Sequence, residues 1–158
     1  MLTRTPHSED EMFKQAGPAR LRVLECQPGS EYDQETFHYF VSVEQARAQR
    51  SGAVVRLLLV SLEPVTGSPV PLPRGVARQV FAGLGAILRD TDIVGWYTQR
   101  VVIGAVLVAP HREAAEDISV FQRRVQLTLS RRLPPPLAAG LQVAIVPCQQ
   151  ILSSGARS

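Results

Sequence analysis

Hydrophobic and polar positions follow two patterns along this chain, which together predict strands and helices in a mixed order. Short apolar runs rich in Val, Ile and Leu are typical of strands, and they occupy residues 54–63, 92–97, 101–108 and 141–147. Apolar residues spaced three and four apart are typical of amphipathic helices, and they occupy residues 33–50, 76–88 and 112–132. The predicted order is helix, strand, helix, strand, strand, helix, strand.

The second and third strands form a predicted β-hairpin around which the rest of the chain is organised. Only Thr98, Gln99 and Arg100 separate the two apolar runs, so residues 97–100 form the tip. We expect both hairpin strands to lie in the middle of a buried sheet. The first strand, residues 54–63, is apolar on both faces, so we expect it to be central and covered either on both sides or along its long axis.

Proline and glycine residues interrupt these elements. Residues 64–75 contain four prolines and two glycines, so we expect an exposed loop outside the helices and the sheet. Whether this loop is a docking segment or a spacer stays open. The three prolines at residues 134–136 prevent continuation of the third helix. Gly83 and Gly85 weaken the second helix, and a close approach to the sheet would explain them.

The order strand–helix–strand–strand–helix–strand predicts an α+β fold of the ferredoxin-like type. This is a two-layer sandwich in which an antiparallel sheet carries helices on one face. The helix at residues 33–50 is an extra N-terminal element. We expect one domain at residues 31–150. It is flanked by an N-terminal tail at residues 1–30, with a short edge strand expected at residues 20–26, and by a C-terminal tail at residues 151–158.

Composition and charge disfavour several classes of protein. The chain carries 17 basic and 14 acidic residues, and its arginine-rich third helix contains a single aromatic residue, Phe121, so we expect no nucleic-acid partner. The two cysteines, Cys26 and Cys148, are too few for a disulfide framework, so a reduced, cytoplasmic location is expected. The first residues lack a signal-peptide pattern, and no apolar run approaches the roughly 20 residues that span a bilayer.

Three segments together resemble the GGDEF, or diguanylate cyclase, family over residues 37–147. They are EQARAQRSG at residues 44–52, RLLLVSLE at residues 56–63 and, above all, LRDTDIVGWY at residues 88–97. In that family the third segment leads into the Gly-Gly-Asp-Glu-Phe hairpin. The resemblance implies a nucleotide-cyclase fold, which is the ferredoxin-like arrangement with an added helix.

The chain departs from this family at the positions that would hold metal and substrate. Where the family's hairpin places two glycines and two acids, this chain has Thr98, Gln99, Arg100 and Val101. Ser61 stands where the resemblance places a metal-binding acid, and Glu63 is the nearby acid that remains. The proline-rich segment replaces the residues that hold the base. Because Mg²⁺ is held by carboxylates and phosphates, we expect no catalysis, no metal site and no cofactor.

One feature of the family is kept. Many members carry an inhibitory Arg-x-x-Asp site, five residues before the glycine pair, that binds cyclic di-GMP. Arg89 and Asp92 have this spacing, and the resemblance implies a ligand-binding role for them. A structural interpretation is also open, because an arginine suits a helix C-terminus and an aspartate bonds to the N–H groups of a turn.

Aromatic and histidine side chains complete the set of candidates. Trp96 and Tyr97 lie next to the hairpin tip, and with Arg100 they are predicted to contact a protein partner if they are exposed together. Packing in the core is the alternative for the two aromatic residues. The three histidines, His7, His38 and His111, are dispersed and adjoin no paired acids, so we expect no metal site at them.

The sequence thus favours a catalytically inactive GGDEF-like module of bacterial signalling, which acts in the cytoplasm by binding a protein partner or a second copy of itself. The alternative is a cyclic di-GMP receptor that uses Arg89 and Asp92. A third possibility, an active diguanylate cyclase, is disfavoured by the missing acids.

Overall fold

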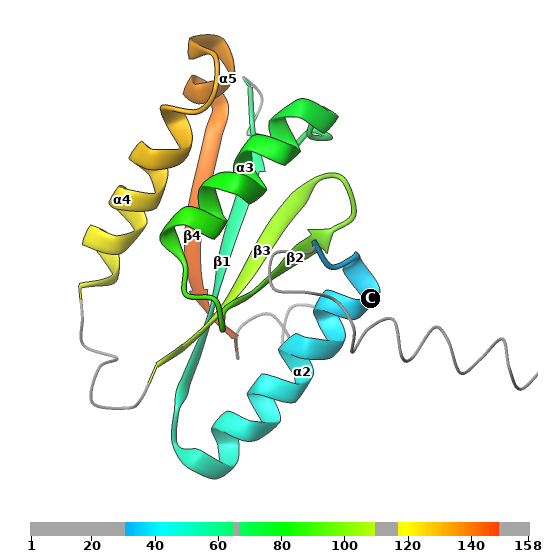
Figure 1. The fold of residues 1–158 in the computed structure, drawn as a ribbon, viewed down its shortest axis with the longest axis vertical. Coiled ribbons are helices and arrows are strands. Elements are labelled where there is room, and N and C mark those ends of the chain that lie inside the picture. Colours follow the sequence, from blue (N-terminus) through cyan, green and yellow to red (C-terminus); the bar gives the residue numbers. More distant parts are fainter. Residues whose placement is uncertain (1–30, 65–66, 110–116, 149–158) are drawn as a thin grey trace, which may run out of the picture. The chain divides into compact units, whose positions relative to one another are not determined.

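The computed structural model describes residues 31–64, 67–109 and 117–148 (Figure 1). The elements in chain order are α2 (Gln34–Ser51), β1 (Val54–Leu62), α3 (Arg74–Ile87), β2 (Ile93–Thr98), β3 (Val102–Ala109), α4 (Ile118–Ser130), α5 (Pro135–Gly140) and β4 (Leu141–Pro147). The strand expected at residues 20–26, both tails, His7, His111 and Cys26 lie outside the described residues. No helix in the described ranges is long and apolar enough to cross a membrane.

The four strands form one antiparallel sheet in the order β2-β3-β1-β4. With one helix between β1 and β2 and α4 before β4, this strand order is the ferredoxin-like arrangement, so the predicted fold class is confirmed. The strands at residues 54–62 and 102–109 pair directly, from Val54 opposite Ala109 to Val60 opposite Ile103. As predicted, β1 is central, since β3 and β4 flank it.

The expected place of the hairpin within the sheet is wrong for one strand. β3 is central, but β2 is an edge strand. Its apolar residues are covered by helices on its two faces, and Tyr32 covers its edge. Trp96 N–H donates to the Tyr32 carbonyl at 2.8 Å, and Tyr32 N–H donates to the Val94 carbonyl at 3.4 Å. The apolar run of β2 therefore reflects burial of its side chains under the helices, and not a position between two neighbouring strands.

Both faces of the sheet are covered, as the double-sided apolar pattern of β1 predicts. Leu58, Val60 and Leu62 pack on one face with residues of α3 and α4, while Val55 and Leu57 pack on the other with Phe37 of α2. The helices expected on one face are α3 and α4, and the extra N-terminal helix α2 covers the opposite face (Figure 1).

Phe37 packs against two glycines that face each other across the hairpin. Gly95 of β2 is paired with Gly104 of β3, and Phe37 is fully buried. A Cβ atom at Gly104 would lie 2.8 Å from two carbons of the Phe37 ring, and one at Gly95 would lie 2.8 Å from Tyr32. The glycine pair therefore lets α2 and the segment before it approach the sheet closely. Gly83 has a different role from the one expected, since a Cβ there would meet Leu129 of α4, not the sheet.

The proline-rich segments are more ordered than their composition predicts. In the described part of the 64–75 loop, Val70 N–H donates to the Leu62 carbonyl at 2.9 Å, and Leu72 is only 4% exposed within the core. The expectation of an exposed loop outside the sheet is therefore wrong at these two residues, because apolar side chains between the prolines are drawn into the core. Pro135 begins α5, where a missing N–H costs nothing, so the prolines start a helix as well as ending α4.

The outer edge of β4 is covered by side chains of α4. Gln122 Nε2 donates to the Val143 carbonyl at 2.8 Å, and Gln126 Nε2 donates to the Leu141 carbonyl at 2.9 Å. Residues four apart in a helix and two apart in a strand advance by similar distances, roughly 6 Å and 7 Å, so the two glutamines match alternate carbonyls. These bonds hold α4 along the edge of the sheet.

We predict that Gly104→Ala lowers the free energy of unfolding by about 1–3 kcal/mol, because the new methyl group would overlap the Phe37 ring. Urea denaturation measures this change. Gly85→Ala is the matched control, because a Cβ there meets nothing within 4 Å and alanine favours the helix by about 1 kcal/mol. Equal effects of the two substitutions would contradict the role of the glycine pair.

Candidate functional site

The first candidate site lies where β1 ends beside the hairpin tip, which the structure places at residues 98–101 and not at the predicted 97–100. The pairing of Val60 with Ile103 brings Ser61 and Glu63 to the same end of the sheet as the tip. Val101 N–H donates to the Thr98 carbonyl at 2.9 Å and closes the turn, with Arg100 exposed at a φ of 66°. A non-glycine residue in this left-handed conformation is uncommon.

The residues at this end do not fit a magnesium ion. The Ser61 hydroxyl donates a long hydrogen bond of 3.5 Å to Glu63 Oε1, so the one carboxylate at the end of β1 faces a hydroxyl group and not a second acid. Mg²⁺ is held by carboxylates together with phosphates. Within the described ranges, no group of three or more His, Cys, Asp or Glu side chains could hold a metal ion.

Backbone hydrogen bonds connect this end of the sheet to neighbouring segments. Leu72 N–H donates to the Arg100 carbonyl at 2.7 Å, and the Leu72 side chain is buried in the core. On the other side, Glu63 N–H donates to the Gly140 carbonyl at 2.7 Å. The described part of the proline-rich loop therefore binds the tip directly.

The tip is tied to the start of α2 as well. Gln34 and Gln99 exchange two hydrogen bonds: Gln99 N–H donates to Gln34 Oε1 at 2.7 Å, and Gln34 N–H donates to Gln99 Oε1 at 3.1 Å. His38 Nε2 donates to the Tyr97 carbonyl at 2.7 Å. These bonds fix the hairpin tip against α2.

Trp96 and Tyr97 lie half-buried on opposite faces of β2. Trp96 packs edge-on against Phe81 of α3, with ring centroids 5.3 Å apart. Tyr97 stacks on His38 of α2 at 5.0 Å, and burial, with a smaller effect of Cys148, raises the pKa of its hydroxyl. The structure therefore does not bring the two rings together on one exposed surface, and Arg100 is the exposed member of the predicted trio.

Arg89 and Asp92 lie in the turn between α3 and β2. Arg89 N–H donates to Asp92 Oδ2 at 2.9 Å, and Asp92 N–H donates to the Arg89 carbonyl at 2.9 Å. Asp92 thus stabilises the turn, as the structural interpretation expects. The Arg89 side chain is exposed and extends from this turn.

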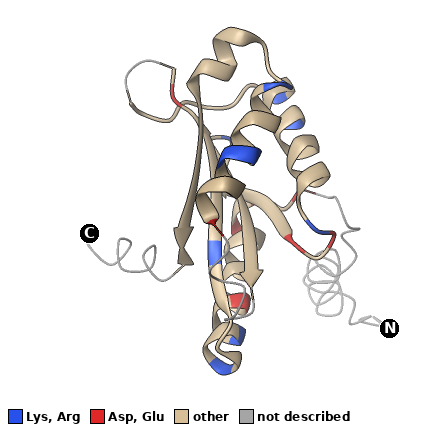
Figure 2. Ribbon diagram, turned by 90° about the vertical axis from the view of Figure 1, so that its left-hand side faces the viewer, with Lys and Arg blue, Asp and Glu red and all other residues tan. Residues whose placement is uncertain are grey.

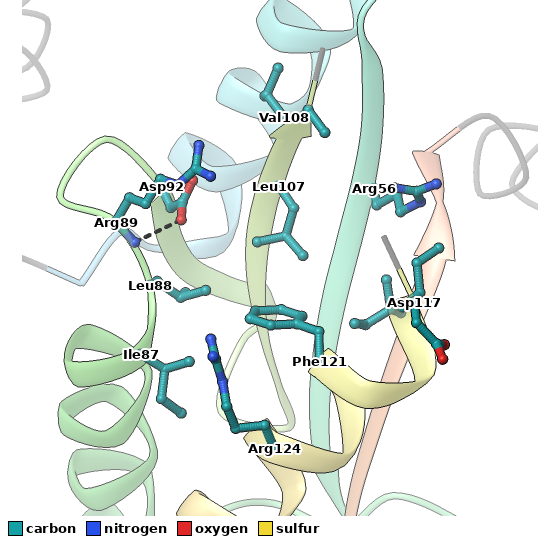
Figure 3. A pocket seen from close by; sticks show the side chains of 13 residues that line it. Arg56, Ile87, Leu88, Arg89, Asp92, Leu107, Val108, Asp117, Phe121 and Arg124 are labelled. Carbon is teal, nitrogen blue, oxygen red and sulfur yellow. Dashed lines mark hydrogen bonds between the residues drawn. The ribbon is translucent and has the colours of Figure 1, made fainter. Parts of the chain in front are cut away.

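The same two residues line a pocket of about 230 Å³, here called the Arg89 pocket (Figure 3). Figure 3 shows Arg89 and Asp92 on one side of it, Arg56 and Asp117 on the other, and Phe121 between them. The remaining walls are largely aliphatic and come from Ile87, Leu88, Leu107, Val108, Ala109, Ile118 and Ile145. The pocket lies between the end of α3, the start of α4 and the sheet.

Arginines that sequence reasoning missed complete the Arg89 pocket. Arg56 comes from β1, and Arg124 comes from α4, where its guanidinium lies 5.3 Å from the centre of the Phe121 ring. Arg56 could have been found from the sequence, because it is the one charged residue inside the apolar run of β1. Asp117 caps α4, and hydrogen bonds from the Ser119 hydroxyl and N–H lower the pKa of its carboxyl.

The charges of the Arg89 pocket suit an anionic ligand that also carries hydrogen-bond donors. Three arginines and two aspartates line it. Guanidinium groups bind phosphates and guanine edges through paired hydrogen bonds, and carboxylates accept from guanine N–H groups. Its volume is below the roughly 300–1,000 Å³ of whole small-molecule sites, so a dinucleotide would be only partly enclosed.

No family model matches this chain, and no curated protein matches it. Among solved structures, it is similar to the crystal structure of a DGC protein from Thermotoga maritima. That match has a TM-score of 0.47 and 12% sequence identity, and it covers 74% of this chain and 79% of that chain. The fold assignment above comes from the strand order of this chain itself.

We predict that Asp92→Ala lowers the free energy of unfolding by about 1 kcal/mol, because the Arg89 N–H loses its acceptor. Arg89→Ala should change it by less than about 0.5 kcal/mol, since this side chain is exposed. Urea denaturation of both variants measures the difference. An equal loss in both would show that the Arg89 guanidinium supports the fold.

Proposed function

We propose that this chain is a catalytically inactive, GGDEF-like regulatory module of bacterial signalling, and that its Arg89 pocket binds cyclic di-GMP. The observation that carries the proposal is the convergence of Arg89 and Asp92, the pair suggested by the family resemblance, with Arg56 and Arg124 around one pocket. Arg56 and Arg124 come from two different elements, β1 and α4, so it is the fold that brings them to the turn that carries Arg89 and Asp92.

The chemistry of each side chain fits a guanine nucleotide. The exposed Arg89 guanidinium can bind a phosphate or the O6 and N7 atoms of guanine. The Asp92 carboxylate uses Oδ2 within the turn, and a carboxylate has a second oxygen that can accept from guanine N–H groups. Arg124 and Phe121 lie together and offer a surface on which a base can stack.

The lack of catalysis is supported by the opposite end of the sheet. Ser61 and Glu63 supply one carboxylate there. The hairpin tip, which would have to be open to a nucleotide, is instead bound by the proline-rich loop through the hydrogen bond from Leu72 N–H to the Arg100 carbonyl. Joining two nucleoside triphosphates builds charge on the phosphoryl oxygens, which divalent cations normally neutralise. With one carboxylate these residues would hold such a cation poorly.

Binding of a protein partner at the hairpin tip is the second candidate function. Arg100 is exposed, and its backbone is held by Leu72 on one side while Gln34 holds the neighbouring Gln99. A rigid, exposed arginine is well suited to an interface. Trp96 and Tyr97, being half-buried, would contribute only their exposed edges.

We predict that cyclic di-GMP stabilises the protein against heat, with a gain of about 2.7 kcal/mol at a concentration 100 times its dissociation constant. Arg89→Ala should abolish this shift in a thermal-shift titration. Arg78→Ala is the matched control, because Arg78 is an exposed arginine of α3 outside the pocket. The absence of a shift in the unsubstituted chain would refute the receptor function.

The same protein, incubated with GTP and Mg²⁺, should form no cyclic di-GMP. Nucleotide chromatography measures the product. Formation of cyclic di-GMP that depends on Glu63 would refute the proposed inactivity. It would not affect the proposed binding of cyclic di-GMP, which the thermal-shift titration tests separately.

A further inference from the structure

Four large apolar side chains are markedly exposed in the described part of the chain. They are Tyr39 at 61%, Val108 at 39%, Val120 at 63% and Leu127 at 49%. Val120 and Leu127 are both on α4, and Tyr39 is on α2. Single exposed apolar residues are common, so what is informative here is the charge around each of them.

The outer face of α4 is apolar and basic. Val120, Arg124 and Leu127 follow at steps of four and three, and Arg123 lies beside them, opposite the buried Val125 on the helix. α4 contains two arginines and no acidic residue, and Arg131 and Arg132 follow its last residue (Figure 2). We call Val120, Arg123 and Leu127 the α4 outer face, since the Arg124 side chain lines the Arg89 pocket.

The outer face of α2 has an aromatic centre and the opposite charge. Glu35 and Tyr39 are four residues apart on α2, opposite the buried Phe37. Glu31 and Asp33 are exposed at the same end of the helix, and no Lys or Arg occurs between Glu31 and Arg47. We call Glu31, Asp33, Glu35 and Tyr39 the α2 outer face.

We propose that copies of this chain associate head to tail, with the α4 outer face of one copy on the α2 outer face of the next. Each face presents an exposed apolar centre, with acids around Tyr39 on α2 and arginines along α4, where the exposed N-cap Asp117 beside Val120 is the exception. Packing Tyr39 between Val120 and Leu127 would remove three of the four exposed apolar side chains from water. Glu35 would then lie among the arginines of the partner helix.

The placement of the two helices decides the kind of assembly. α2 covers one face of the sheet and α4 packs with the other core layer, so both outer faces are accessible in one molecule at the same time (Figure 1). Because the two contacting surfaces differ, the interface is heterologous, and it builds rings or open chains instead of a two-fold dimer. This inference goes beyond the cyclic di-GMP function and does not depend on it.

An anionic membrane is the other occupant that the α4 outer face would suit. That occupant gives no role to Tyr39 and the acids around it. A second copy accounts for both faces, so the two-sided pattern favours self-association.

Sedimentation analysis of the full chain tests the proposal. We expect the average mass to rise with protein concentration at about 50 mM salt and to fall toward the monomer at about 500 mM, because salt screens the charged contacts. Leu127→Ser and Tyr39→Ser should each weaken association by at least about tenfold. Arg78→Ser, at an exposed residue of α3 that lies on neither face and outside the Arg89 pocket, is the control and should leave association unchanged.

Mixing the two variants distinguishes head-to-tail assembly from other modes. The Leu127→Ser chain keeps an intact α2 outer face, and the Tyr39→Ser chain keeps an intact α4 outer face. Their mixture should therefore form a one-to-one complex that grows no further. A monomeric wild-type chain at all concentrations would overturn the proposal, as would wild-type association together with a mixture that forms no complex.

Binding to vesicles that contain anionic lipid is the last measurement. Vesicle binding that Leu127→Ser abolishes and Tyr39→Ser leaves intact, in a chain that does not self-associate, would overturn the proposal in favour of a membrane surface. Circular dichroism spectra show whether each variant is folded. Because neither Tyr39 nor Leu127 lines the Arg89 pocket, the cyclic di-GMP titration remains an independent measurement.

Discussion

The close packing of Phe37 on the paired glycines Gly95 and Gly104 positions much of the remaining structure. It holds α2 against the sheet face opposite α3 and α4. From there Tyr32 reaches the edge of β2, and Gln34 reaches the hairpin tip. A single aromatic ring, accommodated by the absence of two side chains, thus determines where the N-terminal helix meets the hairpin.

Much of the fold could be predicted from local patterns, because apolar spacing reports burial directly. The strand at residues 141–147 has the predicted bounds, and Asp33 and Gly52 begin and end α2 where capping rules place them. The same patterns do not identify what does the burying. β2 has the apolar run of a central strand but lies at the edge, and Leu72 joins the core from a segment whose prolines suggest a loop.

In the candidate site, too, local spacing was predictable and long-range contacts were not. The spacing of Arg89 and Asp92 could be read from the sequence, whereas Arg56 and Arg124 join them only through the folding of distant segments. Neighbouring residues of a strand point to opposite faces, and Trp96 and Tyr97 keep this arrangement, Trp96 against α3 and Tyr97 against α2, although the pairing of β2 with β3 shifts register between Trp96 and Thr98.

Both edges of the sheet are engaged by the chain's own atoms, Tyr32 on β2 and the amides of Gln122 and Gln126 on β4. Proteins often guard such edges because exposed backbone groups invite β-augmentation and, in the extreme, amyloid growth. A foreign peptide would have to displace these groups before it could extend the sheet. The molecule is therefore biased toward recognition through helix surfaces and pockets, and against growth of the sheet from its edges.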